Sequence, residues 1–369
     1  MHRGILSFIL LAFSIVSFAV DLSQVDFSYL YNPNSPVRFQ YRLASDGETL
    51  KVFTKHSSGL TWAFLTQDNF NTTADTPVTP KLIDSTRVEN ELFVEYQFTL
   101  SEVGTYLIFS STQSDFTYYF PVEVKPDIIP SFFPKEEAVL VENYASSLPT
   151  YQSVDALYAY IYAKNFGAAD PPFGNMGALS PVLEIDTLLV YDGDVEVLEN
   201  AFYFIQADTN SSVGSGFLQC PPYFPRYRRI DELISTMQYI CSSREFGDMI
   251  QSPNPRQAFQ DFWIESANGQ AGAKRAIRNY FRRVTAANLL FTNYKPGWQT
   301  DQGMIFLVYG SPDRVESDGR KETWYYGDTE KFDFIKISTL FAPQLYTLIR
   351  DPEYRDSWTQ RIKGIRAGL

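Results

Sequence analysis

The chain has 369 residues, of which 31 are basic and 43 acidic, and its formal net charge at neutral pH is -12. Such a chain lacks the extended basic face that nucleic acids and anionic lipids require, so neither is expected as a partner. The hydrophobic content of 44% is that of a globular protein, and the length suffices for two or three domains.

Residues 1–19 have the pattern of a secretory signal peptide. Arg3 supplies a positive charge, an apolar run covers residues 5–18, and the small residues Ser17 and Ala19 precede the expected cleavage site. The run is short for a membrane span, which needs about 20 residues. We therefore expect an exported protein, with an uncleaved N-terminal anchor as the alternative. No later stretch is long and apolar enough to predict a transmembrane segment in the mature chain.

Residues 20–125 are predicted to form a β-sandwich-like domain. Residues 37–43 alternate apolar and polar side chains, and Asp46-Gly47 then predicts a hairpin turn because glycine accepts positive φ. Further extended runs follow at residues 49–55, 60–66, 92–100, 104–110 and 117–124. Short strands separated by turn residues favour a sandwich of the immunoglobulin-like type.

Residues 126–222 are predicted to form a second β-rich, sandwich-like domain. Pro126, Pro130 and Pro134 mark the connection that precedes it. Its extended runs lie at residues 154–163, 187–191, 195–198, 202–206 and 216–218. The proline-containing stretch 170–174 is expected to be a surface loop.

Residues 223–369 predict an α+β domain. Apolar residues recur at helical spacing, and the expected helices cover residues 230–241, 255–263 and 273–290. The arginines of the third helix fall opposite its apolar face; they are Arg275, Arg278, Arg282 and Arg283. They indicate either a solvated face or a docking face for an acidic partner. Strands are then predicted at residues 304–309, 322–326, 332–337 and 344–349, before a last helix from Pro352.

The pentapeptide Gly297-Trp298-Gln299-Thr300-Asp301 is the most distinctive local pattern. Gly297 permits backbone conformations that other residues avoid, and Trp298 is a large apolar side chain with a single donor. Thr300 and Asp301 are able to bond nearby backbone N–H groups. These properties predict a structural clasp between the helices and the following hairpin.

A ligand pocket is the alternative interpretation of the same region. Trp298 and Trp324 would form its floor, while Thr300, Asp301 and Asp313 would supply polar contacts. Neither interpretation requires a cofactor.

Motifs for common catalytic chemistry are missing from the sequence. His56 is the single histidine beyond the signal, which removes histidine-based triads and histidine-rich metal sites. No phosphate-binding loop, zinc motif or nucleophile elbow is present, so we expect no catalytic residue, no metal and no cofactor. Carboxylate pairs can still hydrolyse glycosidic bonds, and four acidic residues lie close in sequence: Asp301, Asp313, Glu316 and Glu322.

The chain has two cysteines, Cys220 and Cys241. An exported protein can join them in a disulfide. Cys241 also falls on the apolar face of a predicted helix, which equally favours a buried free thiol.

Four features together resemble the GWxTD domain, found in secreted proteins of Bacteroidetes and related bacteria. They are the pentapeptide, the aromatic helix at 258–263, the arginine-rich helix around 280–284, and the hairpin containing residues 322–326. The resemblance covers about residues 230–349. It implies a modular envelope protein and brings no established activity.

The expected function is therefore a non-enzymatic secreted binding or scaffolding protein of the cell envelope. It would be periplasmic or outer-membrane-associated and would contact another envelope protein. One alternative is binding of a carbohydrate or cell-wall polysaccharide through exposed tyrosine and tryptophan side chains. A carboxylate-dependent hydrolase is the third hypothesis.

Overall fold

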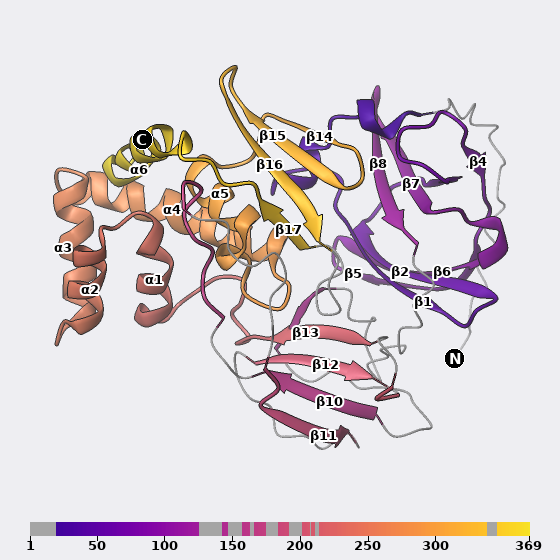
Figure 1. Cartoon of the computed structure of the whole chain (residues 1–369), viewed down its shortest axis with the longest axis horizontal. Coiled ribbons are helices and arrows are strands. Elements are labelled where there is room, and N and C mark those ends of the chain that lie inside the picture. The colour runs from indigo at the N-terminus through magenta and orange to yellow at the C-terminus, as the bar shows by residue number, and fades with distance from the viewer. Residues whose placement is uncertain are drawn as a thin grey trace.

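The structure is a computed structural model that describes residues 20–124, 142–146, 157–162, 166–174, 184–191, 201–206, 208–210, 214–337 and 345–369. These residues contain four β-sheets that are almost entirely antiparallel, and six α-helices that lie in the C-terminal half. Figure 1 shows the helices at one end, two sheets at the other end, and a third sheet below them. The signal peptide predicted at residues 1–19 lies outside the described residues.

Two four-stranded sheets pack against each other in the N-terminal part. The first has the order β1-β2-β6-β5, with β1 Phe39–Ser45, β2 Thr49–Ser57, β5 Lys81–Val88 and β6 Glu91–Thr99. The second has the order β4-β3-β7-β8, with β3 Ala63–Gln67, β4 Thr76–Pro77, β7 Tyr106–Gln113 and β8 Phe116–Glu123. Rings from both sheets meet between them, for example Phe64 with Tyr96, whose centroids are 5.2 Å apart. The core of this part is therefore aromatic.

The predicted hairpin at Asp46-Gly47 is present. Gly47 has a φ of +90°, and Asp46 Oδ1 accepts the N–H groups of Glu48 and Thr49 at 3.0 and 2.7 Å. Strand β5 was not predicted, because all eight of its residues are exposed and it therefore lacks alternation.

A five-stranded sheet follows, with the order β11-β10-β12-β13-β9. Its strands are β9 Tyr144–Ala145, β10 Leu157–Tyr162, β11 Thr187–Tyr191, β12 Phe202–Gln206 and β13 Ser215–Gln219. This confirms the β-rich prediction for residues 126–222, although the predicted run at 195–198 lies outside the described residues. Within the described part of this segment there is one sheet.

Four helices form the next layer: α1 Ile230–Thr236, α2 Ser243–Gln251, α3 Pro255–Ser266 and α4 Gln270–Phe291. Short 3-10 turns lie at Leu22–Gln24 (η1), Ser28–Tyr31 (η2), Leu100–Glu102 (η3), Met237–Tyr239 (η4) and Gly297–Gln299 (η5). Helix α2 was not predicted, yet Ser242 and Glu245 form a capping box at its start. Trp263 of α3 and Tyr280 of α4 are almost fully buried where the helices pack.

The strand predicted at residues 304–309 is wrong, because this run is helix α5, Asp301–Tyr309. Thr300 caps its start, and every residue from Gln302 to Tyr309 is buried. A helix that is apolar all round has no amphipathic period, so the pattern alone does not distinguish it from a buried strand.

The last sheet has the order β14-β15-β16-β17 and packs beside α5. Its strands are β14 Arg314–Ser317, β15 Lys321–Tyr326, β16 Glu330–Ile337 and β17 Leu345–Leu348, and helix α6 covers Tyr354–Ala367. Strand β14 was not among the strands predicted from the sequence.

The N-terminal segment reaches across to this last sheet. Phe27 N donates to Val315 O at 2.9 Å, and Val315 N donates to Asp26 Oδ1 at 2.9 Å. A single hydrophobic cluster consequently runs from Leu22 to Ile365. Among the described residues, no helix has the length and apolar character needed to cross a membrane.

Candidate functional site

The pentapeptide forms a 3-10 turn, η5, between α4 and α5. A Cβ atom placed on Gly297 would overlap the carbonyl oxygen of Ala287 in α4. Gly297 is not among the glycines with positive φ. Glycine is therefore needed here for close approach of two backbones, and not for the conformational freedom that the sequence suggested.

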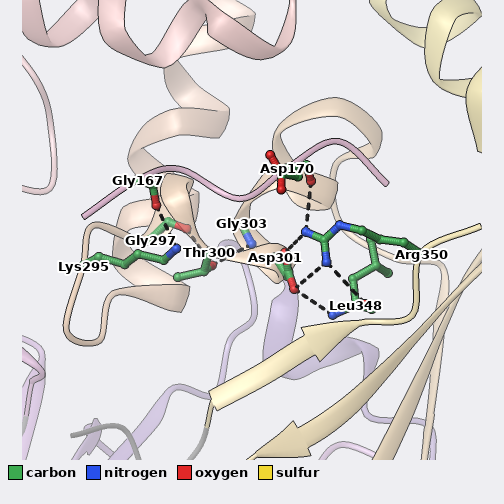
Figure 2. Close-up of polar contacts among 9 residues, drawn as sticks. All are labelled: Gly167, Asp170, Lys295, Gly297, Thr300, Asp301, Gly303, Leu348 and Arg350. Carbon is green, nitrogen blue, oxygen red and sulfur yellow. Dashed lines mark hydrogen bonds and ion pairs between the residues drawn. The ribbon is translucent and has the colours of Figure 1, made fainter. Parts of the chain in front are cut away.

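Thr300 closes the turn and begins helix α5. Its Oγ1 donates to Gly297 O at 2.7 Å and accepts Gly303 N–H at 3.0 Å (Figure 2). This is N-terminal capping, in which a side-chain oxygen satisfies a free N–H of the first turn. Gly303 was not singled out from the sequence, although a Cβ there would overlap Gly297 O.

Asp301 ties the turn to the last sheet through a buried ion pair. Its Oδ1 lies 2.6 Å from Arg350 Nη2, and the two side chains are 11% and 6% exposed. Its Oδ2 accepts Leu348 N–H at 2.8 Å (Figure 2). The ion pair joins positions 49 residues apart, so no local pattern reveals Arg350 as the partner.

A segment from the second β-rich region, residues 166–174, lies across the turn; we call it the strap. Residues 170–174 were expected to be a surface loop, and in the structure every residue of the strap except Pro172 is half-buried or exposed. The strap nevertheless bonds the turn region along its length (Figure 2). The bonds are Ala169 N to Gln299 O at 2.8 Å, Lys295 Nζ to Gly167 O at 3.0 Å, Arg350 Nη2 to Asp170 O at 3.0 Å, and Asp351 N to Pro172 O at 3.0 Å. Burial lowers the pKa of the Lys295 ammonium to about 8.

Trp298 is 3% exposed and packs among aromatic side chains. Its Nε1 donates to Tyr227 Oη at 3.0 Å, and its ring lies edge-on to Tyr239 with the centroids 6.0 Å apart. Beside it is a cavity of about 530 Å³ between the strap, η5 and the region of α1. Its walls include Phe166, Tyr227, Gln238, Phe246, Trp298 and Gln299.

Trp324 and Asp313 lie elsewhere and do not line this cavity. Trp324 is fully buried, and its Nε1 donates to Glu322 Oε2 at 3.1 Å. Asp313 is exposed, and its Oδ2 accepts Gly327 N–H at 2.7 Å. The structure thus brings Trp298 together with Thr300 and Asp301, but separates them from the other two predicted binding residues.

Glu322 is the centre of a second polar cluster. Its Oε2 accepts hydrogen bonds from Tyr31 Oη at 2.6 Å and Gln302 Nε2 at 3.4 Å, besides the one from Trp324. Burial raises the pKa of the Glu322 carboxyl, while the donors around it act in the opposite direction. Because Tyr31 lies in η2, this cluster joins the N-terminal segment to the C-terminal sheet.

The four carboxylates considered for hydrolysis are each engaged in a different place. Glu316 forms an ion pair with Arg314 and accepts Tyr325 Oη at 2.7 Å, while the other three bind the groups described above. None of them lines the cavity. The described residues also contain no cluster of histidine, cysteine and acidic side chains suited to a metal ion.

Both cysteines are free thiols in the structure. Cys220 is buried and Cys241 is partly buried. Burial raises the pKa of the Cys241 thiol to about 12 and raises that of Cys220 further. Of the two alternatives that the sequence left open, the structure therefore has the protonated free thiols.

The turn, the strap and the surrounding helices belong to an α+β module. The polar groups of the turn described above mainly bond other parts of the same module. Residues 201–367 match the family model of the GWxTD domain. The chain is a GWxTD domain-containing protein. The match covers β12 and β13 as well as the helices and the last sheet, and so extends beyond the stretch in which the motifs lie. No curated protein and no solved structure matches the chain.

Proposed function

We propose that this chain is a non-enzymatic secreted scaffolding protein of the bacterial cell envelope, and that it binds an acidic protein partner through helix α4. The observation that carries the proposal is a row of exposed basic side chains, which we call the basic stripe. It consists of Lys274, Arg275, Arg278 and Arg282. Within the part of the chain that the structure describes, none of the four has an ion pair.

An unpaired basic stripe is unusual on a protein whose net charge is -12. Complementary potentials accelerate association and select partners, so a stripe of this sign favours an acidic surface. Arg283 does not belong to the stripe, contrary to the sequence expectation. It donates to the carbonyls of Leu307 and Val308 at 3.2 and 2.8 Å and thereby caps the end of α5.

The state of the pentapeptide supports a non-enzymatic role. Thr300 and Asp301 bond the backbone and Arg350, so their polar atoms are already satisfied inside the domain. A catalytic carboxylate usually needs access to a substrate and a pKa suited to proton transfer. We therefore propose that the pentapeptide is a structural clasp.

The proposed location follows from the signal-peptide pattern of residues 1–19. After cleavage the mature chain would be periplasmic or outer-membrane-associated. We further propose three domains: an immunoglobulin-like sandwich over 20–125, a second sandwich-like domain over 126–222, and the α+β domain over 223–369. The face-to-face sheets and their aromatic core support the first of these assignments.

Carbohydrate binding is the alternative function. Four of the five tryptophans are at most 3% exposed, and Trp62 is only partly exposed among aromatic neighbours. The support for this alternative is therefore the cavity beside Trp298 and not a row of exposed rings. The hydrolase hypothesis has less support, because its carboxylates do not converge.

Crosslinking in intact cells of the source organism, followed by affinity capture and mass spectrometry, tests the scaffold proposal. The variant Arg278→Glu/Arg282→Glu reverses two charges of the basic stripe. We expect the parent to capture one acidic envelope protein, and the variant to lose at least about 90% of it, because attraction becomes repulsion.

The matched control is Arg256→Glu/Lys331→Glu, which makes the same charge change at exposed positions outside the stripe. Capture should be unchanged in this control, and purified partners should associate more slowly as the salt concentration rises. Equal capture by both variants would show that the stripe is not the docking face.

A further inference from the structure

We propose that the acidic partner docks through an amphipathic helix that lies along α4. Its carboxylates would contact the basic stripe, and its apolar side chains would contact the neighbouring apolar pair, Ile277 and Phe281. This proposal rests on the proposed function above and adds the structural class of the segment that docks. Two features of α4 support it: its one-sided charge and the apolar pair beside the stripe.

The charge of helix α4 is one-sided. Its 22 residues include one lysine and four arginines but no acidic residue, in a chain that has 43 acidic residues. Exposed helices are commonly stabilised by opposite charges three or four positions apart. In α4 the same spacing joins like charges, because Arg278 lies four positions from both Lys274 and Arg282.

This arrangement of charges opposes the stability of the helix. Like charges four positions apart repel each other along the helix surface. None of the basic residues lies in the last turn, where a cation would interact favourably with the helix dipole. A local pattern that opposes folding is typical of a functional surface, and an acidic partner segment would remove the repulsion.

The apolar pair borders the stripe. Ile277 and Phe281 are four positions apart and half-buried. Residues three apart on a helix are surface neighbours, which places Phe281 beside Arg278. The same spacing places Ile277 beside Lys274. The ring of Phe281 packs against Phe259 of α3, with the ring centroids 6.0 Å apart, so this part of the surface is held in place.

Helices α3 and α4 lie side by side at the helical end of the molecule (Figure 1). Because α4 bonds its own backbone, it offers no strand edge to which an extended segment could add. An extended segment laid on Ile277 and Phe281 would also bury N–H and C=O groups without partners. A helix satisfies these groups internally and can present acidic and apolar side chains on adjacent faces.

The spacing of the stripe fits such a helix. Arg275, Arg278 and Arg282 extend over about 10 Å of the α4 axis, at about 1.5 Å per residue. A partner helix packed alongside presents carboxylates at the same spacing when acidic residues recur every three or four positions. We therefore expect acidic residues at this period in the partner, with aliphatic residues on the adjoining face.

Photocrosslinking in intact cells of the source organism tests the geometry of the partner segment. A photoreactive amino acid replaces Ala271 in one variant and Thr285 in another. Neither residue belongs to the stripe, and the two flank it at its two ends. Along the helix axis they are about 21 Å apart.

Mass spectrometry of the captured protein gives the position that each variant crosslinks. We expect one acidic protein in both cases, with the two crosslinked positions about 14 residues apart, because a partner helix advances about 1.5 Å per residue. An extended segment advances about 3.3 Å per residue and would give positions about 6 residues apart.

The variant Ile277→Gln tests the apolar contact. It leaves every charge of the stripe in place and should lower the crosslinked yield at least about fivefold, because an apolar contact is lost. The matched control is Ile250→Gln on α2, an isoleucine that is 55% exposed, and it should leave the yield unchanged. Circular dichroism of the purified variants checks that both are folded at the temperature of capture.

The proposal is overturned if the crosslinked positions lie about 6 residues apart, or if no single protein is crosslinked by both variants. It is also overturned if folded Ile277→Gln captures as much partner as the parent. Failure of the scaffold proposal gives a different result, because Arg278→Glu/Arg282→Glu would then capture as much as the parent. If this double variant loses the partner and the crosslinks still show an extended segment, the stripe is the docking face and only the helix is wrong.

Discussion

Asp301 and Glu322 are both buried in the C-terminal domain, yet the protein holds these two carboxylates in opposite ways. Asp301 has a cation, Arg350, at 2.6 Å, together with the Leu348 N–H. Glu322 receives hydrogen bonds from Tyr31, Trp324 and Gln302, and among the described residues no basic side chain forms an ion pair with it. One charge is neutralised by an opposite charge, and the other is solvated by neutral donors.

We call each of these two carboxylates, together with its partners, a joint. The two joints should respond differently to mutation and to pH. A compensated pair depends on both members, because removing one leaves the other charge buried and alone. A carboxyl among neutral donors has a second option, since it can take up a proton and stay hydrogen-bonded. The clasp at Asp301 should therefore be sensitive to mutation, whereas the joint at Glu322 should be sensitive to pH.

The largest effect is expected from Arg350→Met, which keeps much of the side-chain volume and removes the cation. Asp301 would remain buried beside the strap without its partner, and we expect the free energy of unfolding to fall by about 3–5 kcal/mol. Urea unfolding of the mature chain at pH 7 measures this. Arg361→Met is the control, because its pair with Glu330 is more exposed and should be worth less than about 1 kcal/mol. Equal losses in the two variants would remove the distinction between a clasp and a surface ion pair.

A smaller effect is expected from Tyr31→Phe, which deletes the shortest hydrogen bond to Glu322. The carboxylate keeps its other donors, so the loss should be about 1–3 kcal/mol, and it should shrink at low pH where the carboxyl is protonated. The matched control is Tyr325→Phe, since that hydroxyl donates to Glu316 near the surface. The same urea titrations give the answer, and a loss as large as that of Arg350→Met would mean that the two joints do not differ.

Neither the ion pair of Asp301 nor the cluster around Glu322 is predicted by the sequence, in contrast to features that depend on near neighbours in the chain. The hairpin at Asp46-Gly47 and the bond between Thr300 and a nearby backbone N–H depend on neighbours within three residues, and short-range patterns predict them, although the helix that Thr300 caps was not predicted. The partner of Asp301 lies 49 residues away and the partner of Glu322 lies 291 residues away, so both depend on the assembled fold.

The errors have a similar physical origin. Helix α5 was predicted as a strand because its buried run is apolar on all sides. The expectation of a surface loop at 170–174 agrees with the structure for every residue there except Pro172, but only the fold shows that the strap covers the turn. The pentapeptide itself was recognised correctly, but Gly303, Arg350 and the strap complete it from outside the motif.

The smallest change in the free energy of unfolding at neutral pH is expected from Glu322→Gln. This variant is also the most direct test of the comparison between the two carboxylates. Burial raises the folded-state pKa of this carboxyl above its ordinary value of 4.5, so folding favours the protonated form. The resulting stabilisation is fully present below pH 4.5 and is lost as the pH rises through the raised folded pKa. Glutamine resembles the protonated carboxyl and does not titrate. We therefore expect the variant to gain stability relative to the parent as the pH rises above 4.5, as measured by urea unfolding at a series of pH values. Subtracting the parent's free energy of unfolding from that of the variant at each pH removes the contribution of the other titrating groups, which both proteins share. A difference that stays constant across the range would show that Glu322 is as fully compensated as Asp301.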